Sequence, residues 1–392
     1  LYRSSLDADS WLSIAQVFRM LICLVVFEDE AETREVRKPD MNRSLMKVPS
    51  SKEKFPGLAL TMGDPNGIGA EVMLRALDHL SPIKVWQPLI FGDLQVLEEV
   101  RKRLQLDLVF SRIDLDEWSK SRKDQNSRIP VLDLGQQSLN DWEPGTCSSW
   151  GGDSAFRFLN KAIQWTLEGR IDAIVTAPLN KEALKKAGHD FPGHTDILAE
   201  VTGRSRAWMM LECAGLRSVM VTLHISLREV LEQISRPMIL ETIEVAHQAL
   251  LQMGLENPRI GVAGLNPHAG ENGLFGDEER LLITPAIEDA LQKGIQASGP
   301  FSPDTIFLRH RSGEFDVVVA MYHDQALVPL KLMGFGKSVN ITLGLPLIRT
   351  SVDHGTAFDR AASFNSDPSS MEAAIKAAIR LYGSSTVVAD PD

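Results

Sequence analysis

The stretch LALTMGDPNGIGAEVMLRALDHL, residues 58–80, decides the fold class. LALTM (58–62) is a short apolar run typical of a buried strand, GDPNGIG is a glycine-rich turn, and AEVMLRALDHL (70–80) has helical spacing. The same alternation continues in KVWQPLIFG (84–92) and LQVLEEVRKRL (94–104). Apolar strands that alternate with amphipathic helices predict an α/β fold with a mostly parallel sheet.

The alternation continues to the C-terminus of the sequence. Further strands are predicted over 172–178, 217–227, 259–268, 315–323 and 338–348, and further helices over 180–188, 238–254, 279–292 and 370–383. Residues 1–55 lack this periodicity and are predicted to be an extension, either poorly ordered or upstream of a true start at Met41 or Met46. Residues 56–392 are predicted to form a catalytic region of two α/β subdomains, 56–178 plus 317–392 and 179–316.

Composition excludes several classes of protein. The net charge of −11 argues against nonspecific nucleic-acid binding. No apolar run reaches the roughly 18 residues of a membrane helix; the longest candidate, MLICLVVF (20–27), is followed at once by acidic residues. The three cysteines, Cys23, Cys147 and Cys213, are far apart and lack metal-site spacing, which indicates reduced thiols and a cytoplasmic location.

Three histidines follow predicted strands. His224 lies in VTLHIS, His268 in GLNPHAG and His323 in AMYHDQ. Ligands of α/β folds bind beyond the carboxyl ends of strands, and three neutral imidazoles would hold a divalent metal with an open coordination position. No short motif links the three positions, so the pattern leaves a metal site and three unrelated histidines equally open.

Two cations and two loops are further candidates. Lys331 and Arg349 could bind phosphate or carboxylate, although each taken singly is better interpreted as a solvated charge. The turn at 63–69 resembles a phosphate-binding glycine loop, but it is neither G-x-G-x-x-G nor a Walker loop. DHGTAFDRA (353–361) is, as a pattern, a polar loop.

Six motifs together resemble one family. LTMGDPNGIGAE, IVTAPLNKEAL, FPGHTDILAE, LNPHAGENG, MYHDQALVPLK and VNITLGLPLIRTSVDHGTAFD are similar to successive signatures of the 4-hydroxythreonine-4-phosphate dehydrogenases, enzymes of pyridoxal 5′-phosphate (vitamin B6) synthesis. The similarity runs from about Gly57 to the C-terminal helix. It implies the two-domain α/β/α fold of isocitrate and isopropylmalate dehydrogenases and a homodimer with its active site between subunits.

The resemblance also implies a reaction. The C3 hydroxyl of 4-phosphooxy-L-threonine is oxidised with NAD (NADP is left open) and one divalent metal ion, and the 3-keto acid decarboxylates to 3-amino-2-oxopropyl phosphate. Zinc or cobalt suits three imidazoles, whereas magnesium prefers oxygen ligands.

Site residues are carried over motif by motif. The resemblance implies His224, His268 and His323 as metal ligands, and His194, Thr195, Lys331, Asn340 and Arg349 as substrate contacts. DHGTAFDRA is similar to the adenosine-binding loop of the relatives, which implies His354 and Asp359 as cofactor contacts. Asp324 either orients a metal ligand or is simply exposed. After Asp359 the chain reads RAASFNSDPSS, where the family pattern has a glycine soon after the alanine.

Three alternatives stay open. A dehydrogenase of the same family could act on a four-carbon sugar-acid phosphate such as erythronate or threonate 4-phosphate. A three-histidine metal hydrolase would use the same ligands to activate water, but it would not need the DHGTAFD loop. A binding protein without catalysis would not need the full set of histidines and cations.

Overall fold

The structure is a computed structural model that describes residues 55–81, 83, 85–114, 117–118, 128–135, 139–334 and 336–388. The extension predicted over 1–55 therefore lies outside the described residues, apart from Phe55. None of the helices in the described part of the chain is long and apolar enough to cross a bilayer.

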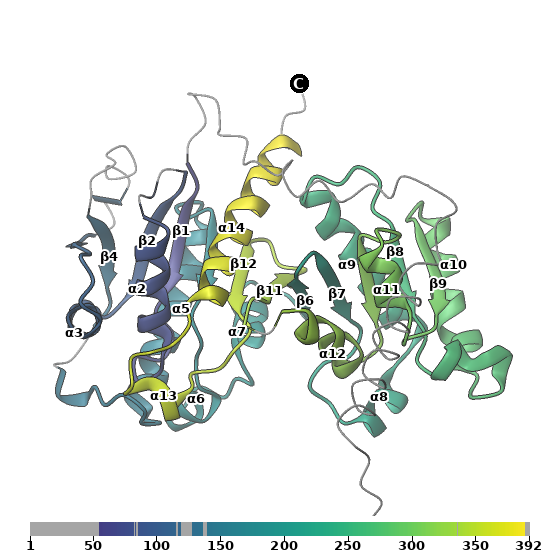
Figure 1. The fold of residues 1–392 in the computed structure, drawn as a ribbon, viewed down its shortest axis with the longest axis horizontal. Helices are drawn as coiled ribbons and strands as arrows, with labels where there is room; N and C mark the ends of the chain where they lie inside the picture. The colour runs from purple at the N-terminus through teal and green to yellow at the C-terminus, as the bar shows by residue number, and fades with distance from the viewer. Residues whose placement is uncertain are drawn as a thin grey trace, which may run out of the picture. The chain divides into compact units, whose positions relative to one another are not determined.

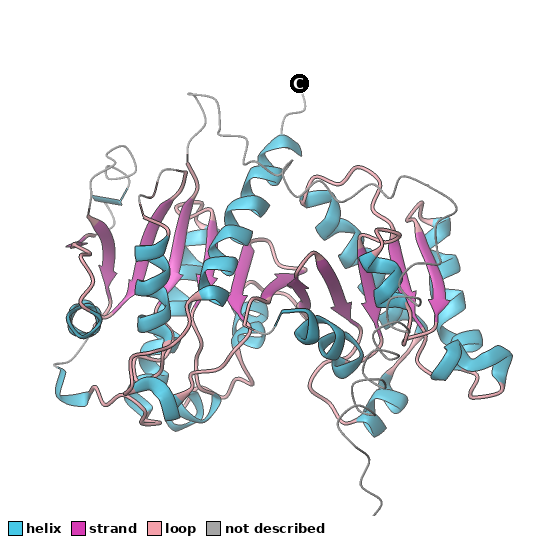
Figure 2. Ribbon diagram, viewed as in Figure 1, coloured by secondary structure: helices cyan, strands magenta, loops and turns pink. Residues whose placement is uncertain are grey.

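One sheet of 12 strands forms the centre of the described chain (Figures 1 and 2). Its spatial order is β3 (Phe110–Arg112), β4 (Ile129–Asp133), β2 (Gln87–Gly92), β1 (Gly57–Thr61), β5 (Ala173–Thr176), β12 (Ile348–Val352), β11 (Val339–Leu343), β6 (Trp208–Cys213), β7 (Leu216–Met220), β10 (Val317–Ala320), β8 (Ile260–Ala263) and β9 (Ala297–Phe301).

The sheet consists of two parallel blocks joined by antiparallel strands. The strands from β3 to β12 are parallel to their neighbours, and so are the strands from β7 to β9. Between the blocks, β11 and β6 are antiparallel to both of their neighbours. The predicted α/β class with a mostly parallel sheet is thus confirmed. The division into two subdomains stays a prediction; β10, which was placed in the first, lies between β7 and β8.

Helices lie on both faces of the sheet (Figure 1). In that view α2 and α14 cover the near face of the first block and α5 the far face. The helices are α2 (Gly69–His79), α3 (Leu94–Leu104), α5 (Ser149–Leu167), α6 (Lys181–Lys186), α7 (His194–Val201), α8 (Leu227–Gln233), α9 (Arg236–Gln252), α10 (Thr284–Gln292), α11 (Ile306–Arg311), α12 (His323–Gly334), α13 (Phe358–Ala361) and α14 (Ser369–Val388).

Two predicted strands are shorter than expected. The segment 338–348 was predicted as one strand, but a turn at Gly344, with φ +79°, divides it into β11 and the start of β12. The segment 217–227 was also predicted as one strand, but β7 ends at Met220. Helix α8 then begins after Ser226, which forms a capping box with Glu229. His224 therefore lies in a loop between a strand and a helix.

One buried histidine has a purely structural role. His310 on α11 is 5% exposed. Its Nε2 accepts a hydrogen bond from the backbone N–H of Arg217 on β7 at 2.8 Å, and its Nδ1 lies 3.0 Å from the carbonyl oxygen of Phe315. Because Nε2 must accept, the ring is neutral and donates from Nδ1. Burial, the largest cause, lowers the pKa of His310.

We expect His310→Phe to reduce the free energy of unfolding by about 1–3 kcal/mol, because the N–H of Arg217 and the carbonyl of Phe315 lose their partner. Since the folded pKa is depressed, the unfolded chain binds the extra proton below about pH 6.5, so the wild type loses stability as pH falls from there. Urea unfolding of both proteins at pH 7.5 and 5.5 measures this.

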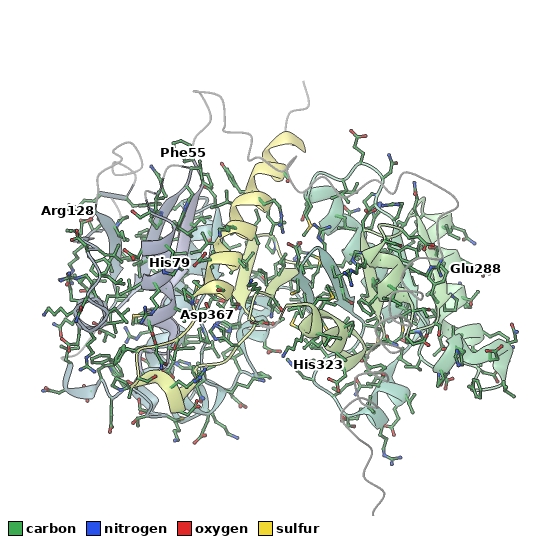
Figure 3. All side chains as sticks on the ribbon, viewed as in Figure 1. Phe55, His79, Arg128, Glu288, His323 and Asp367 are labelled. Carbon is green, nitrogen blue, oxygen red and sulfur yellow. The ribbon has the colours of Figure 1, made fainter. Side chains whose placement is uncertain are left out.

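The matched control for this prediction is His79→Phe, since the side chain of His79 is 54% exposed (Figure 3). An equal loss in both variants, or a pH dependence that survives unchanged in His310→Phe, would contradict the assignment.

Candidate active site

Arg349 is a buried cation without a carboxylate partner. It lies on β12 and is only 1% exposed, although the sequence suggested a residue at a strand end. Its Nη1 donates to the hydroxyl of Thr342 at 2.9 Å and its Nη2 to the hydroxyl of Thr176 at 2.6 Å, whereas its Nε is buried without a partner. Burial lowers the pKa of Arg349 to about 9, so the group stays charged at neutral pH. A buried charge without a carboxylate partner favours the binding of an anion.

Polar side chains share one face of the sheet with Arg349. Arg349 is directly opposite Thr342 on β11, and Asn340 lies two residues before Thr342, so all three point to the same face. Asn340 donates from Nδ2 to the sulfur of Met209, but its Oδ1 is buried without a partner. The face thus presents an unpaired donor on Arg349 and an unpaired acceptor on Asn340.

His194 lies next to Arg349 at the start of α7. Burial, the largest cause, and the nearby charge of Arg349 hold the pKa of His194 well below its ordinary value, and a hydrogen bond to the backbone of Ala177 opposes them only in part. The imidazole is therefore neutral at physiological pH and can donate or accept a hydrogen bond. Thr195 follows in the same first turn. The structure thus brings His194 and Arg349 together.

Lys331 lies on the helix that covers the same face. Leu327 and Leu330 of α12 belong to one buried cluster with Leu211, which is opposite Asn340 in the sheet. Lys331 is half-buried, and within the described part of the chain its ammonium group has no hydrogen bond or ion pair. The fold thus places Lys331 on the layer above Asn340 and Arg349 without a structural partner of its own.

His224 and His323 form a pair. Their ring centroids are 5.5 Å apart, and both line a hollow of about 170 Å³ between α8 and the start of α12. Burial, the largest cause, and the charge of Lys181 lower the pKa of His224. The Nδ1 of His323 lies 2.7 Å from the carboxylate of Asp324, which leaves Nε2 for a ligand. The contact of Asp324 with this ring is the one expected of a residue that orients a metal ligand.

A second hollow adjoins the first. It has a volume of about 350 Å³, is lined in part by Arg206, Trp208 and Met209, and shares Thr222, Leu223 and Ile225 with the hollow at the histidine pair. Met209 is opposite Thr342, the partner of Arg349. The two hollows therefore extend from the histidine pair toward the strand next to Arg349.

His268 lies in an unusual turn after β8. Five consecutive residues, from His268 to Asn272, have φ between +43° and +80°. The left-handed region is unfavourable for residues other than glycine, so the turn must be held by its surroundings. The buried carboxylate of Glu279 accepts hydrogen bonds from the backbone N–H groups of Leu265 and Asn266 at 2.8 and 2.7 Å. This contact anchors the start of the turn.

The three histidines meet the expectation of a metal site only in part. β7, β10 and β8 are neighbours in the parallel block, and His224, His323 and His268 follow their carboxyl ends. The spacing of His224 and His323 suits two imidazoles on one ion. However, the described residues contain no group of three His, Cys, Asp or Glu side chains close enough to hold a metal. His268 is exposed and does not join the pair.

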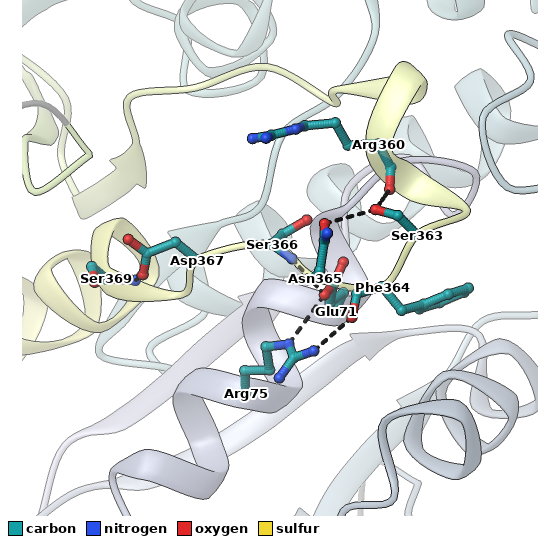
Figure 4. Close-up of polar contacts among 9 residues, drawn as sticks. All are labelled: Glu71, Arg75, Arg360, Ser363, Phe364, Asn365, Ser366, Asp367 and Ser369. Atoms are coloured by element: carbon teal, nitrogen blue, oxygen red, sulfur yellow. Dashed lines mark hydrogen bonds and ion pairs between the residues drawn. The ribbon is translucent and has the colours of Figure 1, made fainter.

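The segment that follows the predicted cofactor loop (353–361) is fixed to α2. The buried carboxylate of Glu71 accepts from the N–H of Ser366 at 2.8 Å and from Nε of Arg75 at 3.1 Å, and Arg75 donates to the carbonyl of Phe364 at 2.7 Å (Figure 4). Phe364 has φ +50°, a conformation that favours glycine, within the segment where the family pattern has one. The contact with Arg75 thus holds a non-glycine residue in the left-handed region.

The two predicted cofactor contacts, His354 and Asp359, lie on the loop of residues 353–361. The Nε2 of His354 is buried and has no partner, whereas Asp359 is exposed on α13. An unpaired buried nitrogen suits a polar group of a ligand such as adenine.

The glycine turn of residues 63–69 has a packing role. A Cβ on Gly63 would lie 2.2 Å from the carbonyl oxygen of Pro178, and one on Gly67 would lie 2.9 Å from Thr356. The turn thus joins the loops that follow β5 and β12. Asp64 in the same turn is fully buried with an unpaired Oδ2, and burial raises its pKa to about 7.

The sequence interpretation did not single out two charged residues near the histidine pair. Lys181 at the start of α6 and Asp196 in the first turn of α7 both act electrostatically on His224. Both occur in motifs of the family resemblance, IVTAPLNKEAL and FPGHTDILAE, and those motifs were the signal that could have identified them as site residues. Only the fold shows that they lie near a histidine that is 43 residues after Lys181 and 28 residues after Asp196.

Known proteins resemble this chain over most of its length. A D-threonate 4-phosphate dehydrogenase from Cupriavidus necator is 45% identical over 82% of this chain and 96% of its own. A 4-hydroxythreonine-4-phosphate dehydrogenase from Geobacter metallireducens is 42% identical over 84% of this chain and 95% of its own. The crystal structure of a 4-hydroxythreonine-4-phosphate dehydrogenase from Klebsiella pneumoniae matches with a TM-score of 0.76 and 41% identity, covering 83% of this chain and 99% of that one.

The family model described as "Pyridoxal phosphate biosynthetic protein PdxA" matches residues 84–378. This match spans strands β2 to β12 and includes Arg349, His194 and the histidine pair. Together with relatives more than 40% identical over their whole lengths, it shows that the chain belongs to the PdxA family.

Proposed function

We propose that this protein is an NAD-dependent dehydrogenase that oxidises 4-phosphooxy-L-threonine at its C3 hydroxyl, in vitamin B6 synthesis. The observation that carries the proposal is the buried guanidinium of Arg349, which has two threonine partners, an unpaired Nε and no carboxylate. A substrate with a carboxylate and a phosphate supplies the missing anion. The names of the relatives, which are phosphorylated-substrate dehydrogenases, support the same reading.

The residues of the chain bind and orient the substrate. Arg349 and Lys331 bind an anionic end of the substrate, and the planar guanidinium of Arg349 can donate to two of its oxygens at once. His194 stays neutral beside Arg349, so it can hydrogen-bond the substrate without adding charge. Asn340 offers its unpaired Oδ1 to a donor of the substrate, and Thr195 adds a hydroxyl.

The histidine pair is the proposed position of the divalent metal, with His268 as the third ligand. NAD supplies the hydride acceptor and the metal supplies Lewis-acid charge near C3. The chain's part is to keep the imidazole of His224 neutral, which its burial supports, and to orient that of His323, which the contact with Asp324 supports. His354 and Asp359 are the proposed contacts to the adenosine half of NAD.

Threonate 4-phosphate is the second candidate substrate. A relative that is 45% identical is named a D-threonate 4-phosphate dehydrogenase, while another at 42% is named for 4-hydroxythreonine 4-phosphate. The two compounds share the carboxylate, the C3 hydroxyl and the phosphate, so Arg349 and the histidine pair would serve either.

A homodimer is part of the proposal. Four large apolar side chains on the two helices beside the histidine pair are exposed, namely Leu227 and Leu231 on α8 and Val328 and Leu332 on α12. Leu332 is 86% exposed, and such apolar surface is typical of a protein interface. A second chain on this surface would complete the site; light scattering that returns the mass of one chain would refute the dimer.

The direct test is the absorbance of NADH after mixing the protein with NAD and each candidate substrate. We expect NADH to form with 4-phosphooxy-L-threonine, to stop after a chelator is added and to resume with Zn²⁺, Co²⁺ or Mg²⁺. Release of 3-amino-2-oxopropyl phosphate and CO₂ identifies the product. Phosphate-ester or amide hydrolysis in the absence of NAD would favour the metal hydrolase instead.

We expect Arg349→Lys to raise the KM for the substrate at least tenfold and to leave the KM for NAD nearly unchanged. A lysine cannot contact Thr342, Thr176 and an anion together, and each charge-assisted bond contributes about 1.5–3 kcal/mol. Arg311→Lys on the exposed end of α11 is the control, and thermal unfolding checks that the variant folds. A raised KM for NAD with substrate affinity intact would place the cofactor at Arg349.

We expect His224→Ala and His323→Ala to lower the bound divalent metal, measured by atomic emission after dialysis, because each removes one of few protein ligands. His268→Ala tests the third ligand, which lies apart from the pair. His79→Ala on the exposed end of α2 is the control. Metal content that survives in one of the three variants would show that this histidine is not a ligand.

A further inference from the structure

Two unpaired side chains of opposite charge flank Gly193. A Cβ on Gly193 would lie 3.8 Å from Cε of Lys181 and 4.0 Å from Oδ2 of Asp196, so both side chains pass over the same glycine. Both residues are exposed. Within the described residues, neither the ammonium group of Lys181 nor the carboxylate of Asp196 has a hydrogen bond or ion pair.

This pair lies beside both parts of the candidate site. Gly193 is the N-cap of α7 and directly precedes His194, which is next to Arg349. The charges of both Lys181 and Asp196 also act on His224. A substrate held at Arg349 and the histidine pair therefore has the two side chains next to it.

The ends of the substrate are chemically distinct. C4 carries the phosphate, C3 the reacting hydroxyl, C2 an amino or a hydroxyl group, and C1 a carboxylate. With C3 at the histidine pair and the phosphate at Arg349 and Lys331, the remaining groups are a carboxylate and a hydrogen-bond donor on adjacent carbons. A lysine and an aspartate side by side match that arrangement in charge and in donor and acceptor character.

We propose that Lys181 binds the C1 carboxylate of the substrate and that Asp196 accepts a hydrogen bond from the C2 group, which makes Asp196 the residue that favours a 2-amino over a 2-hydroxy substrate. This inference rests on the proposed function. Either C2 group can donate to Asp196, but only an ammonium group adds a charge–charge attraction.

Asp196 also offsets the positive charge of the site. Lys181, Lys331 and Arg349 would together repel a substrate ammonium group, and Asp324 is occupied by its contact with His323. Without the carboxylate of Asp196, the site would select a substrate whose only charges are negative, such as threonate 4-phosphate. The position of one carboxylate thus decides between the two kinds of substrate named among the relatives.

The test compares two compounds in matched variants. Asp196→Asn and Lys181→Met are measured with 4-phosphooxy-L-threonine and with D-threonate 4-phosphate, by kcat/KM and by calorimetric Kd without NAD. Glu200→Gln on α7 and Lys185→Met on α6, both exposed, remove the same charges elsewhere on the same helices.

We expect Asp196→Asn to weaken binding of the amino substrate about tenfold or more and that of the hydroxy substrate less than about threefold, because only the former loses a charge-assisted bond. Lys181→Met weakens both about tenfold, since both carry the carboxylate. The two controls change neither value.

Equal losses for the two compounds in Asp196→Asn, or unchanged affinity in Lys181→Met, would overturn this inference while the proposed function stands. A wild-type protein that neither binds nor oxidises either compound would overturn the proposed function itself. Calorimetry keeps the comparison valid if only one compound is turned over.

Discussion

A guanidinium buried without a carboxylate is the constraint around which this site is organised. β11 and β5 flank β12 and present the hydroxyls of Thr342 and Thr176 to Arg349, and these accept hydrogen bonds from its two terminal nitrogens. The antiparallel insertion of β11 is what sets Thr342 directly opposite. The same charge adds to the effect of burial, which is the main reason that the pKa of His194 is low. In the proposed function an anionic ligand would offset the remaining cost of burying Arg349, which would link the topology of the sheet to the chemistry of the substrate.

The local signals of the sequence were sufficient for the fold class and for part of the site. Short apolar runs and helical spacing are local properties, so the parallel α/β sheet and the helix over 94–104 could be predicted. The positions at which strands end could not be predicted as well. The alternation of 338–348 continues through a turn that only Gly344 and Pro346 interrupt, and the apolar run before His224 continues beyond the last ladder residue, Met220. Where hydrogen bonding stops is a property of the neighbouring strand, which a single segment does not contain.

For the same reason, the sequence could not show which distant segments lie close together. Lys181 and Asp196 stood inside recognisable motifs, but their closeness to His224 depends on how α6 and α7 lie against the second parallel block. The burial of Arg349 depends likewise on β5, which is far from β11 and β12 in the sequence. Phe364 is a further case: its left-handed backbone is held by Arg75 on α2, a contact that its own segment of the sequence does not show.

The left-handed turn at His268 also limits which residue types its positions can accept. Five successive residues, 268–272, occupy a region in which β-branched side chains clash with their own backbone. Valine, isoleucine or threonine would be excluded at these positions however mild the change in polarity, whereas glycine, asparagine and aspartate would be accommodated. Backbone geometry therefore restricts which residues can replace those of this turn, in addition to any restriction from the proposed role of His268.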